Sequence, residues 1–247
     1  MLLAIDIGNT NISIGLFNND SIVFEGRLST DISRTSDQYA LEIRGIAELK
    51  SISLKDISGA IISSVVPSLT SSIKTAVFQL TGIEAMILGP GVKSGLHIKI
   101  DNPAQLGADL VAGAAGAREK YPLPCLVIDL GTATKISVLD SAGAYLGCSI
   151  SPGVCISLNA LSGSAALLPN INISLDNCPA YGTNTVTSMQ AGVVLGTAAM
   201  LDGLCDRIEK HLGVKMSTIV ATGGYAKSII SHCNREVIFD KNLLFFH

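Results

Sequence analysis

One pattern occurs twice in this chain, about half the chain apart, and it limits the possible folds more than any other feature. The pattern is a β-rich apolar run that reaches an Asp and then a Gly, followed by hydroxyl or amide residues and a second alternating run. The first copy contains Asp6 and Gly8, and the second contains Asp129 and Gly131. Each copy is typical of a strand, a tight turn and another strand. We therefore expect two similar halves that face one another, with both turns at one cleft.

Between and after these copies, strand patterns alternate with helical patterns, which predicts an α/β fold. Helical spacing of apolar residues occurs in 37–49, 68–80, 104–120 and 189–212, and short buried strands are expected at 60–66 and 219–221. The last helix has an apolar face spaced by alternating fours and threes: Val194, Ala198, Leu201, Cys205, Ile208 and Leu212. Pro122 and Pro124 mark the predicted boundary between an N-terminal domain, 1–121, and a C-terminal domain, 122–247.

Composition excludes several classes of protein. The chain has 247 residues, of which 48% are hydrophobic and 15% charged, so it can bury a core and does not resemble a disordered chain. Its net charge of −3 argues against a basic surface for nucleic acid. The longest apolar stretches fall short of the roughly 20 residues that span a bilayer. We expect a cytoplasmic protein without a membrane span, a secretory leader or a nucleic-acid partner.

The first turn, Asp6-Ile7-Gly8-Asn9-Thr10, has donors that suit phosphate. A tight turn of Gly, Asn and Thr exposes backbone N–H groups and a hydroxyl that can bind phosphate oxygens. The Asp would repel phosphate, so it makes sense if a cation lies between the two charges. The same reasoning applies to the second turn, with Asp129, Thr132 and Thr134. Either turn alone could be an ordinary hairpin, but two at matching places favour phosphate binding.

Two other positions suit ligand binding or catalysis. The glycines of Thr222-Gly223-Gly224 follow a predicted strand and would let the backbone approach a flat group such as adenine or ribose. The alternative is a plain strand-to-helix turn. Asp109 lies between apolar residues, Leu106 before it and Leu110 after it. Asp109 is either a solvated helix residue or a functional base.

Taken in order, these segments resemble the type III pantothenate kinases, a family of the actin-like and sugar-kinase superfamily. The resemblance covers nearly the whole chain, and its blocks are highly specific only in combination. The blocks are Asp6–Thr10, Arg34–Thr35, Ser63–Pro67, Asn102–Asp109, Asp129–Thr134, Ser151–Gly153, Leu161, Leu168–Pro169, Asn184–Thr185, Gln190–Gly192 and Ala221–Gly224.

This resemblance implies two duplicated ribonuclease-H-like (actin-like ATPase) domains, each a mixed sheet flanked by helices. It implies that ATP phosphorylates the terminal hydroxyl of pantothenate, the first step towards coenzyme A. It also implies a homodimer with the active site at the subunit interface. The implied cofactors are Mg²⁺ and a monovalent cation, K⁺ or NH₄⁺.

The resemblance also implies residue roles. Asp109 would be the catalytic base, Asp6 would hold Mg²⁺ with ATP, and Asp129 would hold the monovalent cation. The implied ATP-binding residues are Asp6, Ile7, Gly8, Asn9, Thr10, Asn11, Thr132, Thr222, Gly223 and Gly224. The implied substrate-binding residues are Ile100, Gly107, Ala108, Asp109, Leu110, Asn184 and Thr185.

Three positions depart from the family's usual pattern. Leu110 stands where an Arg is usual, Ile100 where a Tyr is common, and Lys135 where a Thr is usual. The first two changes remove polar groups that would grip pantothenate. Lys135 could either face phosphate or point to solvent. Two alternatives therefore stay open: a catalytically weak nucleotide-binding regulator, and a related kinase for another small hydroxyl substrate. In the second case Lys93, Lys99 or Arg118 could replace the missing Arg.

Overall fold

The chain forms two compact units, each built around a five-stranded mixed sheet. The structure is a computed structural model that describes residues 1–19, 21–89, 92–165, 168–169, 171 and 178–245. The first unit comprises Met1–Gly95, Asn102–Gly113 and Leu244–His247, and the second comprises Leu96–Asp101 and Ala114–Leu243. The boundary predicted between residues 121 and 122 stays a prediction.

The first sheet has the strand order β3-β2-β1-β4-β5. Its strands are β1 (Leu2–Ile7), β2 (Asn11–Asn18), β3 (Ser21–Ser29), β4 (Gly59–Ser64) and β5 (Met86–Ile87). β1, β2 and β3 form an antiparallel meander, and β4 and β5 are added in parallel. β1 is a nearly continuous apolar run, which is typical of a strand covered on both faces.

The second sheet repeats this plan with the order β10-β9-β6-β7-β8. Its strands are β6 (Cys125–Leu130), β7 (Ala133–Leu139), β8 (Tyr145–Pro152), β9 (Thr218–Thr222) and β10 (Ile238–Phe239). When the two orders are aligned, β6 takes the place of β1 and β9 that of β4, with the same directions. The two similar halves predicted from the repeated pattern, and the mixed sheets that the resemblance implies, are thus confirmed.

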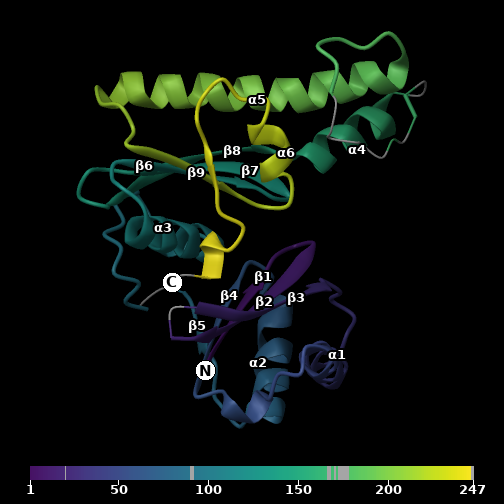
Figure 1. The fold of residues 1–247 in the computed structure, drawn as a ribbon, viewed down its shortest axis with the longest axis vertical. Helices are drawn as coiled ribbons and strands as arrows, with labels where there is room; N and C mark the ends of the chain where they lie inside the picture. Colours follow the sequence, from purple (N-terminus) through teal and green to yellow (C-terminus); the bar gives the residue numbers. More distant parts are fainter. Residues whose placement is uncertain (20, 90–91, 166–167, 170, 172–177, 246–247) are drawn as a thin grey trace. The chain divides into compact units, whose positions relative to one another are not determined.

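Two helices of the first unit, α1 (Ser36–Leu49) and α2 (Pro67–Thr81), pack against each other and against the first sheet (Figure 1). α1 begins with a capping box between Thr35 and Gln38, which satisfies two backbone donors. α2 has Pro67 in its first turn and ends at Gly82, whose φ of 71° is left-handed. Both helices match their predicted ranges within one or two residues.

In the second unit, α4 (Val154–Ser164), α5 (Thr185–Leu212) and α6 (Ala226–Ile230) pack on the second sheet. Figure 1 shows α5 lying along the whole sheet. Within the described residues α5 is the one helix long and apolar enough to cross a membrane, but core helices pass the same test. Its predicted apolar face lies in the core, where Val194, Ala198, Leu201 and Cys205 are buried.

The helix predicted over 104–120 begins later than expected. Pro103–Gln105 forms a separate 3₁₀ turn, and α3 covers Ala108–Lys120. Leu106 between them is extended, with ψ of 122°, so one helix cannot run through it. α5, in contrast, begins four residues earlier than predicted, because the Asn184 side chain accepts a hydrogen bond from the Thr187 N–H and caps it.

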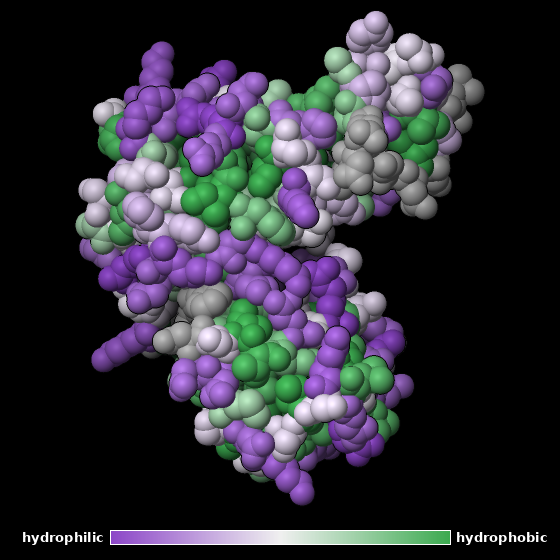
Figure 2. All heavy atoms as spheres, viewed as in Figure 1, coloured by the Kyte–Doolittle hydropathy of each residue, from purple (hydrophilic) through white to green (hydrophobic). Residues whose placement is uncertain are grey.

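Exposed apolar side chains occur on and next to α4. Ile156 and Leu161 lie on this helix, and Ile150 lies near the end of β8. Tyr181 lies in the segment before α5, and Val186 lies in the first turn of α5. Figure 2 shows hydrophobic atoms at the surface of this region, at the upper right. We call these five residues the α4 face.

Candidate active site

The first sheet places Asp6 at an edge where two strands end. Asp6 lies near the end of β1 and is directly opposite Ser63 on the parallel strand β4. The Ser63 hydroxyl is fully buried and donates a 2.9 Å hydrogen bond to Oδ1 of Asp6. Ligands of open α/β sheets bind beyond the carboxyl ends of parallel strands. Ser63 therefore holds the Asp6 carboxylate at the edge where a ligand is expected.

The first turn is held at both ends by hydrogen bonds. The Gly8 N–H donates to the carbonyl of Asn11 at 3.0 Å, and the Thr30 hydroxyl donates to the carbonyl of Gly8 at 2.6 Å. The Thr30 N–H donates to the carbonyl of Thr10 at 3.0 Å. Asn9, Thr10 and Asn11 are exposed, whereas Ile7 is buried in the sheet. The predicted phosphate turn is thus a fixed loop with an exposed polar tip.

Asp109 lies at the same edge of the first sheet, through a short chain of contacts. The Val65 N–H, just after β4, donates to the carbonyl of Ile7 at 3.0 Å. A Cβ on Gly107 would lie 3.9 Å from Cγ1 of Val65 and 2.7 Å from Oδ1 of Asp109. That oxygen also accepts the Leu110 N–H at 2.8 Å. The first unit therefore places the segment that carries the half-buried Asp109 beside the end of β4, the strand on which Ser63 bonds Asp6.

This geometry gives Gly107 a positioning role that sequence reasoning did not foresee. A Cβ at 2.7 Å from the Asp109 oxygen would force that carboxylate to move. Ala108 is buried against Leu88 and Ala112 and anchors the start of α3, while Leu110 is half-buried. Gly107 and Ala108 thus set where the Asp109 carboxylate points.

The second turn is tighter than the first by one residue. β6 and β7 are joined by Gly131 and Thr132 alone, and the Gly131 N–H donates to the carbonyl of Ala133 at 3.2 Å. A Cβ on Gly153 would lie 2.3 Å from the carbonyl oxygen of Thr132. The side chain of Thr132 is exposed. Close backbone contact from Gly153 therefore fixes this turn and leaves the Thr132 hydroxyl at the surface.

Thr222, Gly223 and Gly224 divide into two kinds of residue. Thr222 is buried opposite Asp129 in the sheet, and Gly223 has a φ of 101° with its Cα against the backbone of Leu130. Gly224 is exposed and has open space where a Cβ would be. Gly224 is therefore the residue of the three that a flat ligand can approach.

Next to these glycines, Oη of Tyr225 lies 2.5 Å from Sγ of Cys155. The hydrogen bond with Cys155, together with burial, raises the pKa of Tyr225 to about 12. A tyrosine is neutral at pH 7 even with its ordinary pKa of about 10, and this shift keeps the phenol protonated at still higher pH.

Lys135 points towards Asp129. The two residues are opposite each other on β7 and β6, and Nζ of Lys135 lies 2.7 Å from Oδ2 of Asp129. Each side chain is only 15% exposed. The sequence left two orientations of Lys135 open, one facing phosphate and one pointing to solvent. The structure excludes the second.

The other predicted substrate residues belong to the second unit. Asn184 caps α5, and Thr185 is exposed as its first residue. Ile100 is half-buried and follows Lys99, whose hydrogen bond to Asp140 holds the pKa of that carboxyl below its usual range. Of the substrate-binding set, only Gly107, Ala108, Asp109 and Leu110 lie in the first unit.

Lys93, Lys99 and Arg118 are the candidate replacements for the Arg that is usual where Leu110 stands. Lys99 forms an ion pair with Asp140, at 2.8 Å, in the second unit. The side chain of Arg118 lies against Gly143, also in the second unit. Lys93 is exposed in the first unit, beside Val92, which packs against the cluster at the start of α3. Lys93 is thus the one of the three that shares a unit with Asp109.

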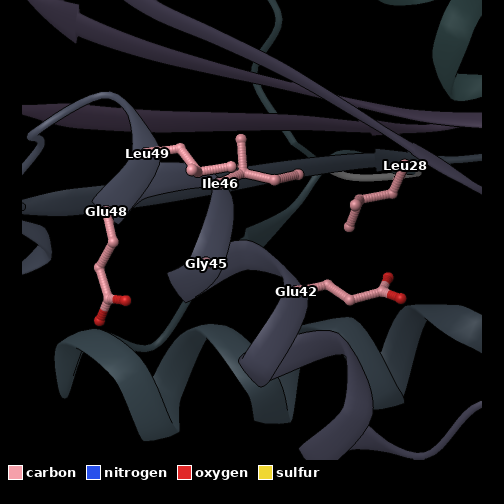
Figure 3. Close-up of a pocket in the computed structure, with 6 residues that line it drawn as sticks. All are labelled: Leu28, Glu42, Gly45, Ile46, Glu48 and Leu49. Atoms are coloured by element: carbon pink, nitrogen blue, oxygen red, sulfur yellow. The ribbon is translucent and has the colours of Figure 1, made fainter.

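A hollow of about 650 Å³ in the first unit lies apart from these residues (Figure 3). It is lined by Leu28, Glu42, Gly45, Ile46, Glu48 and Leu49. None of the predicted site residues lines this hollow. Five of its six lining residues belong to helix α1, and two of these, Glu42 and Glu48, are acidic. Two acids make this hollow unsuitable for phosphate groups.

Sequence reasoning assigned no role to Ser63, Thr30 or Gly153, which hold the two turns. The sequence could have pointed to Ser63, because a polar residue that directly follows the apolar run of a buried strand needs a hydrogen-bond partner. Thr30 and Gly153 had no such signal, since each acts by contacting a turn far away in the sequence.

Known proteins resemble this chain over most of its length. The family model described as type III pantothenate kinase matches residues 2–207. Curated proteins named type III pantothenate kinase from Listeria monocytogenes, serotype 4a (strain HCC23) and serotype 4b (strain CLIP80459), are 38% identical over 240 residues, which covers 97% of this chain and 92% of each relative.

Solved structures share the fold at low identity. A protein from Campylobacter jejuni described as a Baf family transcriptional activator has a TM-score of 0.60 at 21% identity, covering 98% of this chain and 93% of its own. The activator of 2-hydroxyisocaproyl-CoA dehydratase from Clostridium difficile has a TM-score of 0.56 at 16% identity, covering 99% and 91%. These neighbours share the α/β fold of this chain, with its two mixed sheets.

Proposed function

This chain belongs to the type III pantothenate kinase family and phosphorylates pantothenate with ATP in coenzyme A biosynthesis, and we propose that Asp109 is its catalytic base. The observation that carries this proposal is the edge of the first sheet, where Ser63 holds Asp6 and Gly107 makes room for Asp109. A hydroxyl that attacks phosphorus needs a nearby group to orient it and accept its proton. Asp109 has a half-buried carboxylate that is fixed in direction by the Leu110 N–H.

The protein itself takes little part in the covalent chemistry of phosphoryl transfer. The transition state is loose, so catalysis comes mainly from positioning and from neutralising charge on the transferred group. Asp109 therefore needs only to hold the pantothenate hydroxyl in line and take its proton late. A carboxylate whose direction is set by a backbone N–H is suited to that task.

Asp6 is proposed to hold Mg²⁺ together with ATP. Mg²⁺ prefers oxygen ligands and is commonly bound by one or two carboxylates plus substrate phosphates. Within the described residues no three His, Cys, Asp or Glu side chains cluster as a metal cage. A single oriented carboxylate beside an exposed turn fits a metal that arrives with its nucleotide. When bound, Mg²⁺ would neutralise charge on the phosphates.

The two turns are proposed to bind the ATP phosphates. Asn9, Thr10 and Asn11 form the exposed tip of the first turn, next to Gly8, Ile7 and Asp6. Thr132 offers its hydroxyl from the second turn. Gly224 lets adenosine approach the backbone. Thr222 at the end of β9, and Gly223 directly after it, hold Gly224 in place. Asn184, Thr185 and Ile100 are proposed to contact pantothenate, along with Gly107, Ala108 and Leu110.

The test of this activity is ADP release from ATP by the purified protein with Mg²⁺, with and without pantothenate. We expect ADP release to depend on pantothenate. A folded protein that binds ATP without any pantothenate stimulation would favour the regulator. Stimulation by another small alcohol, but not by pantothenate, would favour the related kinase, in which Leu110 and Ile100 have changed the substrate.

We also propose a cytoplasmic homodimer that uses the α4 face. Exposed apolar side chains on and next to α4 would be covered by a second copy. The Ile156→Glu substitution should weaken the dimer by roughly 30-fold or more, because it places a carboxylate in an apolar contact. Sedimentation equilibrium measures this change. Val214→Glu is the matched control, since Val214 is 42% exposed and Ile156 43%, and Val214 lies outside the α4 face. An I156E protein as dimeric as V214E would contradict the proposed interface.

A further inference from the structure

The second phosphate turn already contains a positive charge. A monovalent cation at Asp129 would need the carboxylate oxygens as ligands. Oδ2 of Asp129 instead lies 2.7 Å from the ammonium nitrogen of Lys135. A free cation at the same oxygen would be repelled by that ammonium. The residues present therefore do not fit a free monovalent cation at Asp129, and no step of the reaction is derived from one.

The position of Lys135 follows from the sheet. Asp129 and Lys135 are directly opposite in the antiparallel pair of β6 and β7, so their side chains lie on the same face. Both are only 15% exposed, and a carboxylate or an ammonium with so little solvent requires an opposite charge. Gly131 leaves space beside the pair, since a Cβ there would lie 3.3 Å from Oδ1 of Asp129. The pair is thus built into the base of the turn that carries Thr132.

From this pair we infer that Lys135 is a tethered replacement for the monovalent cation of the second phosphate turn. A lysine ammonium is a compact point charge of the same sign as K⁺ or NH₄⁺. It offsets the charge of Asp129, which would otherwise repel the phosphates of ATP. The inference rests on the proposed function, because it assumes that this turn binds ATP. It makes the enzyme independent of K⁺ and NH₄⁺.

The experiment compares pantothenate-dependent ADP release in choline chloride and in KCl at equal ionic strength. The parent protein should have the same rate and the same ATP affinity in both salts. Lys135→Thr leaves the half-buried Asp129 carboxylate without its ammonium and opens space beside it. We expect this variant to lose about tenfold or more of its rate in choline. K⁺ or NH₄⁺ should restore most of that loss.

A second readout does not depend on turnover. Crystals soaked in Tl⁺, a substitute for K⁺ with strong anomalous scattering, should show an ion beside Asp129 in Lys135→Thr and none there in the parent. Lys135→Met fills the space with an apolar chain and should stay impaired in both salts. Lys215→Thr is the control, because Lys215 forms an ion pair with Glu209 at 2.7 Å and is far more exposed, at 83%. It should behave as the parent does.

The outcomes separate this inference from the proposed function. A parent protein that is active in KCl and nearly inactive in choline would overturn the inference while leaving the kinase activity established. A parent without pantothenate-dependent activity in either salt, but with intact folding, would instead contradict the function. A K135T protein with parental rates in both salts and no bound Tl⁺ would also contradict the inference, since the Lys135 ammonium would then have no effect on the reaction.

Discussion

The Asp109→Asn variant should fold, bind MgATP as the parent does, and turn over about a thousandfold more slowly. General bases contribute typically 10²–10⁴-fold, and an amide cannot accept the proton of the attacking hydroxyl. The amide oxygen of asparagine can still accept the Leu110 N–H that now bonds Oδ1 of Asp109. The start of α3 therefore keeps its local structure, and the loss falls on kcat. Single-turnover kinetics would measure the rate of the chemical step, a thermal melt would measure folding, and an ATP titration would measure the affinity for MgATP.

Glu119→Gln provides the matched control for this prediction. Glu119 is another carboxylate on α3, exposed near its C-terminal end. Its neutralisation should leave kcat within about twofold of the parent, because surface substitutions away from a site have small effects. D109N turnover within a few-fold of the E119Q value would show that Asp109 is not the base.

The Gly223→Ala substitution, next to the second turn, should strongly destabilise the protein. Gly223 has a φ of 101°, and its added Cβ would lie 2.5 Å from the carbonyl oxygen of Leu130. The nearest atoms are all backbone, so no side chain can swing away. Strain and overpacking of this kind each cost about 1–3 kcal/mol. We expect a loss of about 2–5 kcal/mol in unfolding free energy, which lowers Tm by several degrees or more.

The neighbouring glycine is the control. Gly224 lacks the left-handed φ and has open space around its Cα, so Gly224→Ala should change Tm by no more than about 2 °C. Differential scanning calorimetry of the two variants compares them directly. G223A should also lose ATP affinity, because the displaced backbone of Leu130 leads straight into Gly131 and Thr132. Equal Tm values for G223A and G224A would contradict the strained contact.

Much of the fold was predictable because its signals are local. The alternating apolar runs of the strands and the helical spacing of Val194, Ala198 and Leu201 each depend on residues close together in the chain. The beginning of α3 was mispredicted because Leu106 adopts an extended backbone that helical spacing alone does not reveal. That break lets Gly107 approach the Asp109 carboxylate, so the error fell at the proposed site.

The sequence by itself determined the duplication, the α/β class, the two Asp-Gly turns and the candidates Asp6, Asp109 and Asp129. These follow from residue type and spacing, which act over a few residues. Only the tertiary structure decided that Ser63 holds Asp6, that Gly107 makes room for Asp109 and that Lys135 neutralises Asp129. The contacts of Ser63 and Lys135 each join two different strands. Strand order and register set them, and a change of register by one residue would turn every such side chain to the other face of its sheet.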